Sequence, residues 1–305
     1  MSRRLAIGSV VVFAAGCLLS AQQVFRAGTD LVLLTVTAAR GSHTAATGLV
    51  QEDFEVFEDG VRQEILLFTR EPQPISLSIL IDASSSMDNK LRVAQTAAIG
   101  FCRRLGPEDV AQVTAFSNDN RIRQTFTNDI DALERAILQT RANGSTALYS
   151  AIYVALNELN MMRRRQAPDE ISRQAIVVLS DGEDTTSLTH YEDLLELGKR
   201  SDVAIYAIAL RDRNPTPTRR FNEADYVLRA LSQSTGGRVF FVSDVNQLPV
   251  IYNQIADELA QQYTIGFISS NPARDGAWRQ IGVRVAQPSV VARTRTGYFG
   301  PKQVP

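Results

Sequence analysis

The chain has few of the residues that most often perform chemistry. Its 305 residues include two cysteines, two histidines and one tryptophan. Cys17 lies in an apolar leader, so Cys102 has no partner for an internal disulfide. No histidine lies near Cys102 in the sequence, so a cysteine nucleophile is not expected there. We therefore expect Cys102 to be a small buried thiol.

An excess of charge of one sign is also absent. The chain has 32 Lys and Arg against 33 Asp and Glu, for a formal net charge of −1. This balance does not point to nucleic acid or to an anionic membrane surface. The sequence has neither a G-x-G-x-x-G motif nor a Gly-Lys-Ser/Thr phosphate loop, which argues against a nucleotide-binding enzyme. No zinc signature is present, and His43 and His190 complete no Ser-His-Asp set.

The N-terminus, "MSRRLAIGSVVVFAAGCLLSAQQ", has no apolar run long enough for a comfortable transmembrane helix. Its apolar stretch runs only from Leu5 to Leu19, whereas a spanning helix needs about 20 residues. Two arginines precede this stretch, and the small pair Ser20 and Ala21 follows it. This is the form of a secretory signal. We expect residues 1–21 to be a signal peptide and the protein to be exported to the periplasm, the cell envelope or the outside. An uncleaved leader or a lipid anchor is the alternative.

Two β-rich segments, residues 24–72 and 261–300, bracket a region of alternating strand and helix patterns, residues 75–260. Within the first segment, Asp59-Gly60 predicts a hairpin turn. The central region predicts an α/β fold: a Rossmann-like doubly wound, mostly parallel sheet with one antiparallel edge and helices on both faces. Neither flank is large enough for a core of its own, so we expect both to form one accessory β unit.

Two apolar strand patterns end on a carboxylate. "ISLSILID" ends at Asp82, and "QAIVVLSD" ends at Asp181. In parallel sheets of this kind the functional crevice lies outside the carboxyl ends of the strands. Ser84 and Ser86 share the loop after Asp82, and Thr146 lies in a glycine-containing loop that opens a helix. Together these residues offer two carboxylates and three hydroxyls, which are the donors that hard divalent cations such as Mg²⁺ prefer.

Each of the two segments also has a simpler interpretation. "DASSSM" would serve as a helix cap, because Asp and Ser are favoured N-cap residues. "DGEDT" would serve as an ordinary turn. Their joint occurrence at the ends of two core strands, with a Gly-Ser-Thr loop between them, favours a shared site.

This set resembles the metal-ion-dependent adhesion site of the von Willebrand factor A domain. The resemblance covers about residues 75–260, and Asp82, Ser84, Ser86, Thr146 and Asp181 fill every position of the motif. It implies that the three hydroxyls bind metal directly and that the two carboxylates act largely through water. The flanks, including "LVQEDFEVFEDGVRQEILLF" and "RTRTGYF", resemble exported bacterial proteins of the VWFA-related Acidobacterial domain family.

The resemblance implies a binding or adhesion module that uses Mg²⁺ or Mn²⁺, and not an enzyme. An anionic oxygen from a protein or other partner would complete the metal shell, and nucleic acid is not expected as a partner. Contact with a membrane is expected only through the leader or a lipid anchor. A metal-dependent hydrolase and a structural cell-envelope protein with an idle site are the alternatives.

The residues around the motif lead to three further expectations. Asp88-Asn89 offers only one acid, so a second cation beside the site is not predicted. Glu183 and Asp184 are expected to be solvated or to lie just outside the metal's ligands. We expect Asp82→Ala to abolish metal binding while the fold survives, because the strand end is expected to lie outside the core.

Overall fold

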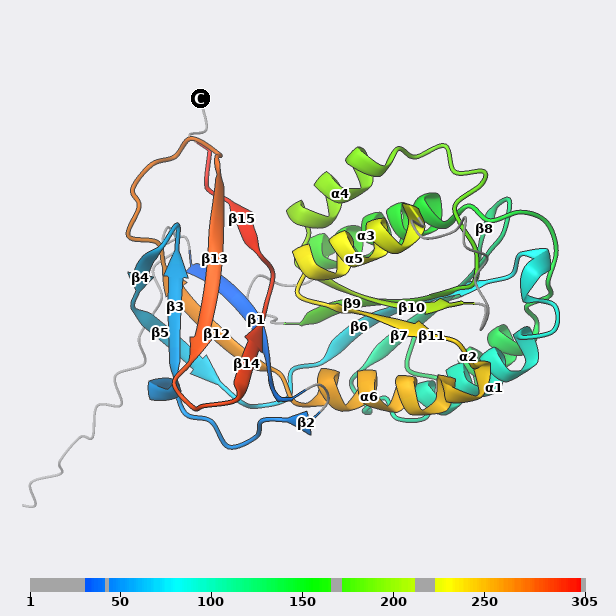
Figure 1. Ribbon diagram of the computed structural model, residues 1–305, viewed down its shortest axis with the longest axis horizontal. Helices are drawn as coiled ribbons and strands as arrows, with labels where there is room; N and C mark the ends of the chain where they lie inside the picture. Colours follow the sequence, from blue (N-terminus) through cyan, green and yellow to red (C-terminus); the bar gives the residue numbers. More distant parts are fainter. Residues whose placement is uncertain (1–30, 42–43, 166–171, 212–222, 303–305) are drawn as a thin grey trace, which may run out of the picture.

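The computed structural model describes residues 31–41, 44–165, 172–211 and 223–302. The predicted signal peptide and His43 lie outside these residues. No helix among the described residues is long and apolar enough to cross a membrane. Figure 1 shows two neighbouring parts, a β unit and a larger α/β domain.

The α/β domain is built on a six-stranded sheet with the order β11-β10-β9-β6-β7-β8. The strands are β6 (Ile75–Asp82), β7 (Val110–Phe116), β8 (Asn120–Thr127), β9 (Arg173–Ser180), β10 (Val203–Leu210) and β11 (Arg238–Val242). All neighbours are parallel except β8, which runs antiparallel to β7. Every residue of β6 is buried, because helices cover both faces of the sheet. The predicted doubly wound sheet with one antiparallel edge is confirmed.

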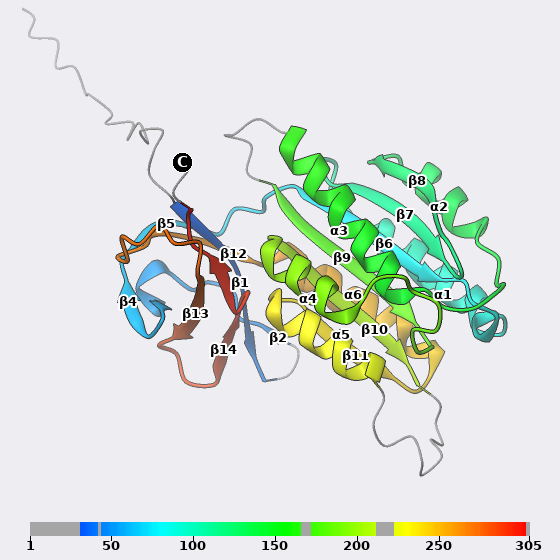
Figure 2. The ribbon, with the colours of Figure 1, turned by 90° about the horizontal axis from the view of Figure 1, so that it is seen from above.

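Helices lie on both faces of this sheet. One face packs against α1 (Leu91–Cys102), α2 (Ile130–Leu138) and α6 (Leu248–Ala260). The other packs against α3 (Leu148–Arg165), α4 (Tyr191–Arg200) and α5 (Glu223–Ser234), which Figure 2 shows side by side above the sheet. Cys102 is buried at the end of α1 and forms no disulfide. Burial raises the pKa of its thiol to about 12. The predicted buried thiol is therefore confirmed.

The β unit consists of two small sheets. One has the order β14-β1-β12-β5, with β2 beside β1, and the other has the order β15-β13-β3-β4. Their strands are β1 (Leu31–Arg40), β2 (Thr44–Ala45), β3 (Phe54–Glu58), β4 (Val61–Gln63), β5 (Ile65–Thr69), β12 (Tyr263–Ile268), β13 (Trp278–Val285), β14 (Val290–Arg293) and β15 (Gly297–Phe299). The two flanks of the chain are paired strand by strand, β1 with β12 and β3 with β13. The predicted single accessory unit is therefore confirmed.

The turn between β3 and β4 shows why the sequence forms this hairpin. Asp59 and Gly60 have φ angles of 48° and 82°. Both central residues of a type I′ turn need positive φ, which Asp-Gly tolerates well. The predicted hairpin is therefore present at the predicted residues.

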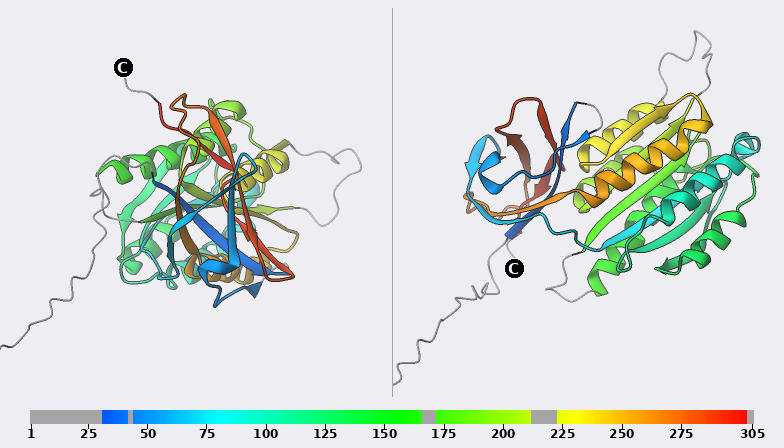
Figure 3. Two further views of the ribbon diagram at one scale, coloured as in Figure 1. Left: turned by 90° about the vertical axis from the view of Figure 1, so that its left-hand side faces the viewer. Right: turned by 90° about the horizontal axis from the view of Figure 1, so that it is seen from below.

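The "RTRTG" segment attaches the β unit to the α/β domain. Arg293 Nε donates to the Gly236 carbonyl at 3.0 Å, and its guanidinium pairs with Glu258. Arg295 pairs with Asp202 and donates to the Leu33 carbonyl at 3.0 Å. A Cβ on Gly236 would lie 2.7 Å from the Arg295 amide nitrogen, so only glycine allows this close approach. The right-hand view of Figure 3 shows the β unit directly beside the α/β domain.

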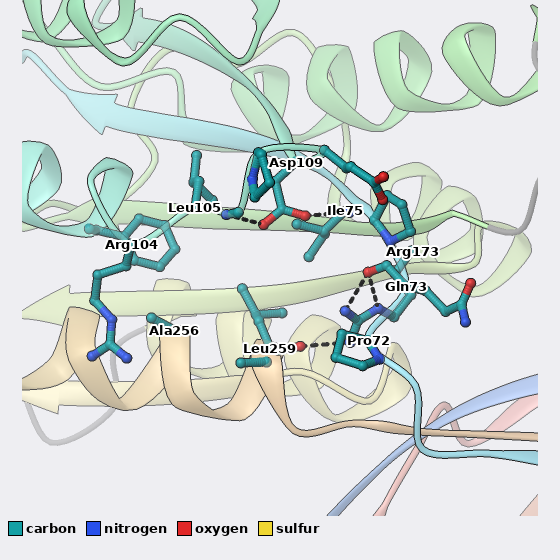
Figure 4. Close-up of a pocket in the computed structure, with 15 residues that line it drawn as sticks. Pro72, Gln73, Ile75, Arg104, Leu105, Asp109, Arg173, Ala256 and Leu259 are labelled. Carbon is teal, nitrogen blue, oxygen red and sulfur yellow. Dashed lines mark hydrogen bonds between the residues drawn. The ribbon is translucent and has the colours of Figure 1, made fainter.

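A cavity of about 330 Å³ lies where the linker from the β unit enters the α/β domain, beside α1 and α6 (Figure 4). Its polar groups are used to hold the chain together. Arg173 donates to the carbonyls of Gln73, at 3.1 and 2.5 Å, and of Leu259, at 2.6 Å. Asp109 accepts from the Ile75 amide at 3.0 Å. These bonds fix both connections of the α/β domain at the amino ends of its strands.

We expect Arg173→Ala to lower the free energy of unfolding by about 1–3 kcal/mol, because partly buried carbonyl acceptors lose their donor. Burial lowers the pKa of the Arg173 guanidinium, which is consistent with its enclosed position. Urea unfolding monitored by circular dichroism measures the change. Arg92→Ala, at an exposed position of α1, is the control. Equal unfolding midpoints for the two variants would show that Arg173 does not hold the junction.

Candidate metal centre

Asp82 is the last residue of β6, and its side chain is enclosed. The residue has 0% exposure, Oδ1 accepts from the Ser84 amide at 2.8 Å, and Oδ2 accepts from Ser180 Oγ at 2.6 Å. Burial raises the pKa of Asp82, and the charge of Asp181 adds to the rise. The expectation that Asp82 lies outside the core is wrong. The carboxylate is held rigidly beneath the loop that follows.

The serines of "DASSSM" do not cap a helix. They enter a single 3₁₀ turn, η2 (Ser85–Met87), in which Ser84 makes no side-chain cap bond. Helix α1 begins later, after Lys90, again without a side-chain cap. The helix-cap interpretation of this segment is therefore not supported. The Ser84 and Ser86 hydroxyls instead contact each other, and that of Ser86 contacts the second strand end.

Ser84, Ser86 and Asp181 bring their oxygens together. Ser84 Oγ lies 3.0 Å from Ser86 Oγ, and Ser86 Oγ donates to Asp181 Oδ1 at 2.6 Å. Adjacent ligands of an octahedral Mg²⁺ at about 2.1 Å are separated by about 3.0 Å. The two serine hydroxyls therefore already have the spacing of neighbouring ligands. Asp181, whose side chain is 1% exposed, adds the negative charge.

Thr146 is positioned by the loop that follows β9. Its amide donates to Thr185 Oγ1 at 3.1 Å, and its carbonyl accepts from the Thr185 amide at 2.8 Å. A Cβ on Gly182 would lie 3.2 Å from Thr146 Oγ1, so this hydroxyl lies directly beside the residue that follows Asp181. The structure thus places Thr146 next to the end of β9, on the loop that the sequence analysis selected.

Asp184 accepts hydrogen bonds from residues at the start of α3 and in the loop after β9. Its Oδ1 accepts from the Tyr149 amide at 3.1 Å and from Ser187 Oγ at 2.6 Å. A carboxylate that accepts from a first-turn amide stabilises a helix start, here that of α3. Of the two roles expected for Asp184, solvated or just outside the metal's ligands, the first does not describe it, because its carboxylate is engaged in these bonds. Glu183, in contrast, is exposed.

Two residues that contact the site were not predicted from the sequence. Ser180 Oγ donates to Asp82, and Lys90 Nζ lies 2.5 Å from Asp181 Oδ2. Ser180 immediately precedes Asp181 in an otherwise apolar strand, so a hydroxyl there was a usable signal. Lys90 gave no such signal, because it looks like the first residue of an amphipathic helix.

The donor set suits a hard divalent cation. The described residues contain no group of three or more His, Cys, Asp or Glu side chains that could hold a metal ion. The candidate instead combines two carboxylates, Asp82 and Asp181, with the hydroxyls of Ser84, Ser86 and Thr146. Oxygen donors without sulfur or imidazole fit Mg²⁺ or Mn²⁺. The lysine ammonium on Asp181 shows that this carboxylate already attracts a cation.

The fold and this oxygen-lined edge define a doubly wound α/β domain with a candidate metal centre at its strand ends. Residues 76–254 match the von Willebrand factor type A domain family, and the chain belongs to that family. No curated protein matches the chain.

Two solved structures share the fold. A von Willebrand factor type A protein from Catenulispora acidiphila is 13% identical, with a TM-score of 0.51, and the match covers 89% of this chain and 75% of that one. Proximal thread matrix protein 1 from the mussel byssus, solved with a zinc-occupied MIDAS motif, is 17% identical, with a TM-score of 0.50. That match covers 66% of this chain and 49% of the mussel protein. At these identities the likeness shows the fold alone.

Proposed function

We propose that this protein is an exported binding module that captures a partner through a divalent cation, Mg²⁺ or Mn²⁺. The observation that carries the proposal is the cluster of Ser84 Oγ, Ser86 Oγ and Asp181 Oδ1, whose successive oxygens lie 3.0 and 2.6 Å apart. Domains of this family commonly mediate metal-dependent protein interactions. The mussel protein carries zinc in the corresponding type of motif, so zinc belongs in any test of metal preference.

The hydroxyls and the two carboxylates of the proposed site have different tasks. Ser84, Ser86 and Thr146 supply neutral hydroxyl ligands, which leave most of the cation's charge uncompensated. Asp181 lies beside Ser86 and contributes negative charge, largely through water. Asp82 accepts from the Ser84 amide and the Ser180 hydroxyl, and it thereby orients the loop of residues 83–87, here called the serine loop. A cation held in this way retains a coordination position for an anionic oxygen of the partner.

The position of the β unit supports a role in displaying the site. Strand β6 starts at the linker and ends at Asp82, and eight extended residues span roughly 23 Å. The candidate site therefore lies at the end of the α/β domain opposite the β unit (Figure 1). We propose that the flanks belong to the VWFA-related Acidobacterial domain family and that the leader directs export. If the leader anchors the protein, the site would then face away from the point of attachment.

Capture of a partner with and without chelator tests this proposal. The protein is immobilised and incubated with envelope extract in Mg²⁺, Mn²⁺, Zn²⁺ or EDTA, and retained proteins are identified by mass spectrometry. A partner retained with metal and released by EDTA supports the binding module. Turnover of phosphate or ester substrates in the same metals would instead favour the hydrolase, and retention indifferent to EDTA would favour the structural protein.

We expect Thr146→Ala to weaken metal-dependent partner retention about tenfold, because one hydroxyl ligand is lost from the shell. The free energy of unfolding should change by less than about 1 kcal/mol, since the backbone bonds to Thr185 remain. Surface plasmon resonance with the captured partner measures the affinity. Thr96→Ala is the control, because its hydroxyl bonds to the Arg92 carbonyl within α1. A loss of affinity in the Thr96 variant as well would indicate a general effect on the domain.

A further inference from the structure

Lys90 forms an ion pair inside the candidate site. Its Nζ lies 2.5 Å from Asp181 Oδ2, and the two side chains are 33% and 1% exposed. Within the described part of the chain, no other cationic side chain forms an ion pair with Asp82 or Asp181. Lys90 is therefore the group that compensates the negative charge of the paired strand ends.

The position of Lys90 follows from the local backbone. Met87 is fully buried, and the Lys90 amide donates to its carbonyl at 2.8 Å. This tight turn closes the serine loop just before α1 begins at Leu91. The long lysine stem then reaches the second strand end, where Nζ meets Asp181. The chain has only three lysines among its 32 basic residues, and one of them lies here.

An ammonium and a divalent cation compete for the same carboxylate. Asp181 accepts from Ser86 Oγ on Oδ1 and pairs with Lys90 on Oδ2. A divalent cation between Ser86 and Asp181 would stand within a few ångströms of Nζ, where two like charges repel strongly in a partly enclosed site. Both cations therefore cannot occupy their best positions together.

We propose that Lys90 is a built-in counter-ion that holds the site closed without metal and is displaced from Asp181 when a divalent cation binds. This inference rests on the proposed metal site. The exchange makes metal binding weaker than the oxygen set alone would allow, because the lysine pair must be broken first. It also keeps the paired carboxylates compensated, so the serine loop retains its shape between binding events.

The reactivity of the three lysines tests the exchange within one molecule. The protein is reductively methylated with isotope-coded formaldehyde in EDTA or in saturating Mg²⁺, and each lysine is quantified by mass spectrometry. Lys90 should react slowly in EDTA and about tenfold faster in Mg²⁺, as expected when an ion pair with a buried carboxylate is released. Lys199 and Lys302, far from the site in sequence, serve as internal controls and should not change.

Calorimetry of Lys90→Gln gives the second measurement. Removing the competing ammonium should tighten Mg²⁺ binding about tenfold relative to wild type. Lys199→Gln is the matched control, because Lys199 lies over the Trp278 ring in the junction with the β unit. The Mg²⁺ affinity of this variant should equal that of wild type. Weaker binding by Lys90→Gln would mean that Lys90 assists the metal, which contradicts displacement.

The outcomes separate this inference from the function on which it rests. Wild-type protein that binds Mg²⁺ with unchanged Lys90 reactivity overturns the exchange and leaves the metal site standing. If titration with Mg²⁺ releases heat from Lys90→Gln but not from wild type, the result supports the competition and shows that Lys90 holds Asp181 more strongly than Mg²⁺ does. No heat from either protein overturns the metal site and the exchange together.

Discussion

Asp82→Asn is expected to weaken Mg²⁺ binding at least about 100-fold while the protein stays folded. The substitution removes one of two carboxylate charges from the proposed site. The asparagine oxygen still accepts from the Ser84 amide, and its amide group donates to Ser180 Oγ. Because the hydrogen bonds of the enclosed side chain persist, the serine loop should keep its position. Isothermal titration calorimetry of wild type and variant measures the loss of heat.

Asp109→Asn is the matched control for this charge change. Asp109 also accepts backbone amides, those of Ile75 and Gly106, but at the opposite end of the sheet. The Asp109→Asn protein should therefore bind Mg²⁺ as tightly as wild type does. Asp82→Ala is the less informative variant, because it leaves the Ser84 amide and the Ser180 hydroxyl without their acceptor in a fully buried position. Equal heats from wild type and Asp82→Asn would contradict a metal role for this strand end.

Local patterns were enough to predict the α/β fold. Strands β6 and β9 read as apolar runs, with no polar alternation beyond the serines of β6, since both faces of the central sheet are covered by helices. The antiparallel edge of the sheet, which β8 forms, and the Asp59-Gly60 turn were also evident, because their geometry depends on neighbouring residues. The joining of the flanks followed from size, since neither has enough apolar surface for a core alone.

Side-chain partners in the site depended on distances that the sequence does not show. Asp184 and Glu183 are adjacent, yet one accepts from the start of α3 and the other is exposed. Asp82 was expected at an open strand end, but the Ser180 hydroxyl and the serine loop enclose it. Lys90 belongs to a helical pattern by spacing, and only the three-dimensional turn at Met87 brings its ammonium to Asp181. The oxygen types of the site were predictable, whereas their charge compensation was not.

The β unit also contains an ion pair that the sequence does not predict, because its two buried side chains lie far apart along the chain. Arg279 on β13 and Glu58 on β3 are each 2% exposed, and Arg279 Nη1 lies 3.3 Å from Glu58 Oε1. Glu58 also accepts from Ser269 Oγ at 2.6 Å and from the Tyr298 hydroxyl at 2.7 Å. The guanidinium further donates to the carbonyls of Asn271 and Ala273. One pair thus ties the N-terminal flank to three parts of the C-terminal flank.

Arg279→Met is expected to lower the free energy of unfolding by about 3–5 kcal/mol, because it leaves the Glu58 carboxylate buried without a cation. Adding Glu58→Gln should recover part of this loss, since the amide carries no charge, its oxygen still accepts from one of the Ser269 and Tyr298 hydroxyls, and its NH₂ group donates to the other. Arg284→Met is the control on the same strand, where an exposed arginine only stacks over the Phe57 ring, and it should lose less than about 1 kcal/mol. Urea unfolding of the four proteins, wild type included, measures these differences. If the double variant is no more stable than Arg279→Met, an isolated charge is not the cause, and the lost carbonyl bonds of the 271–273 loop account for the change.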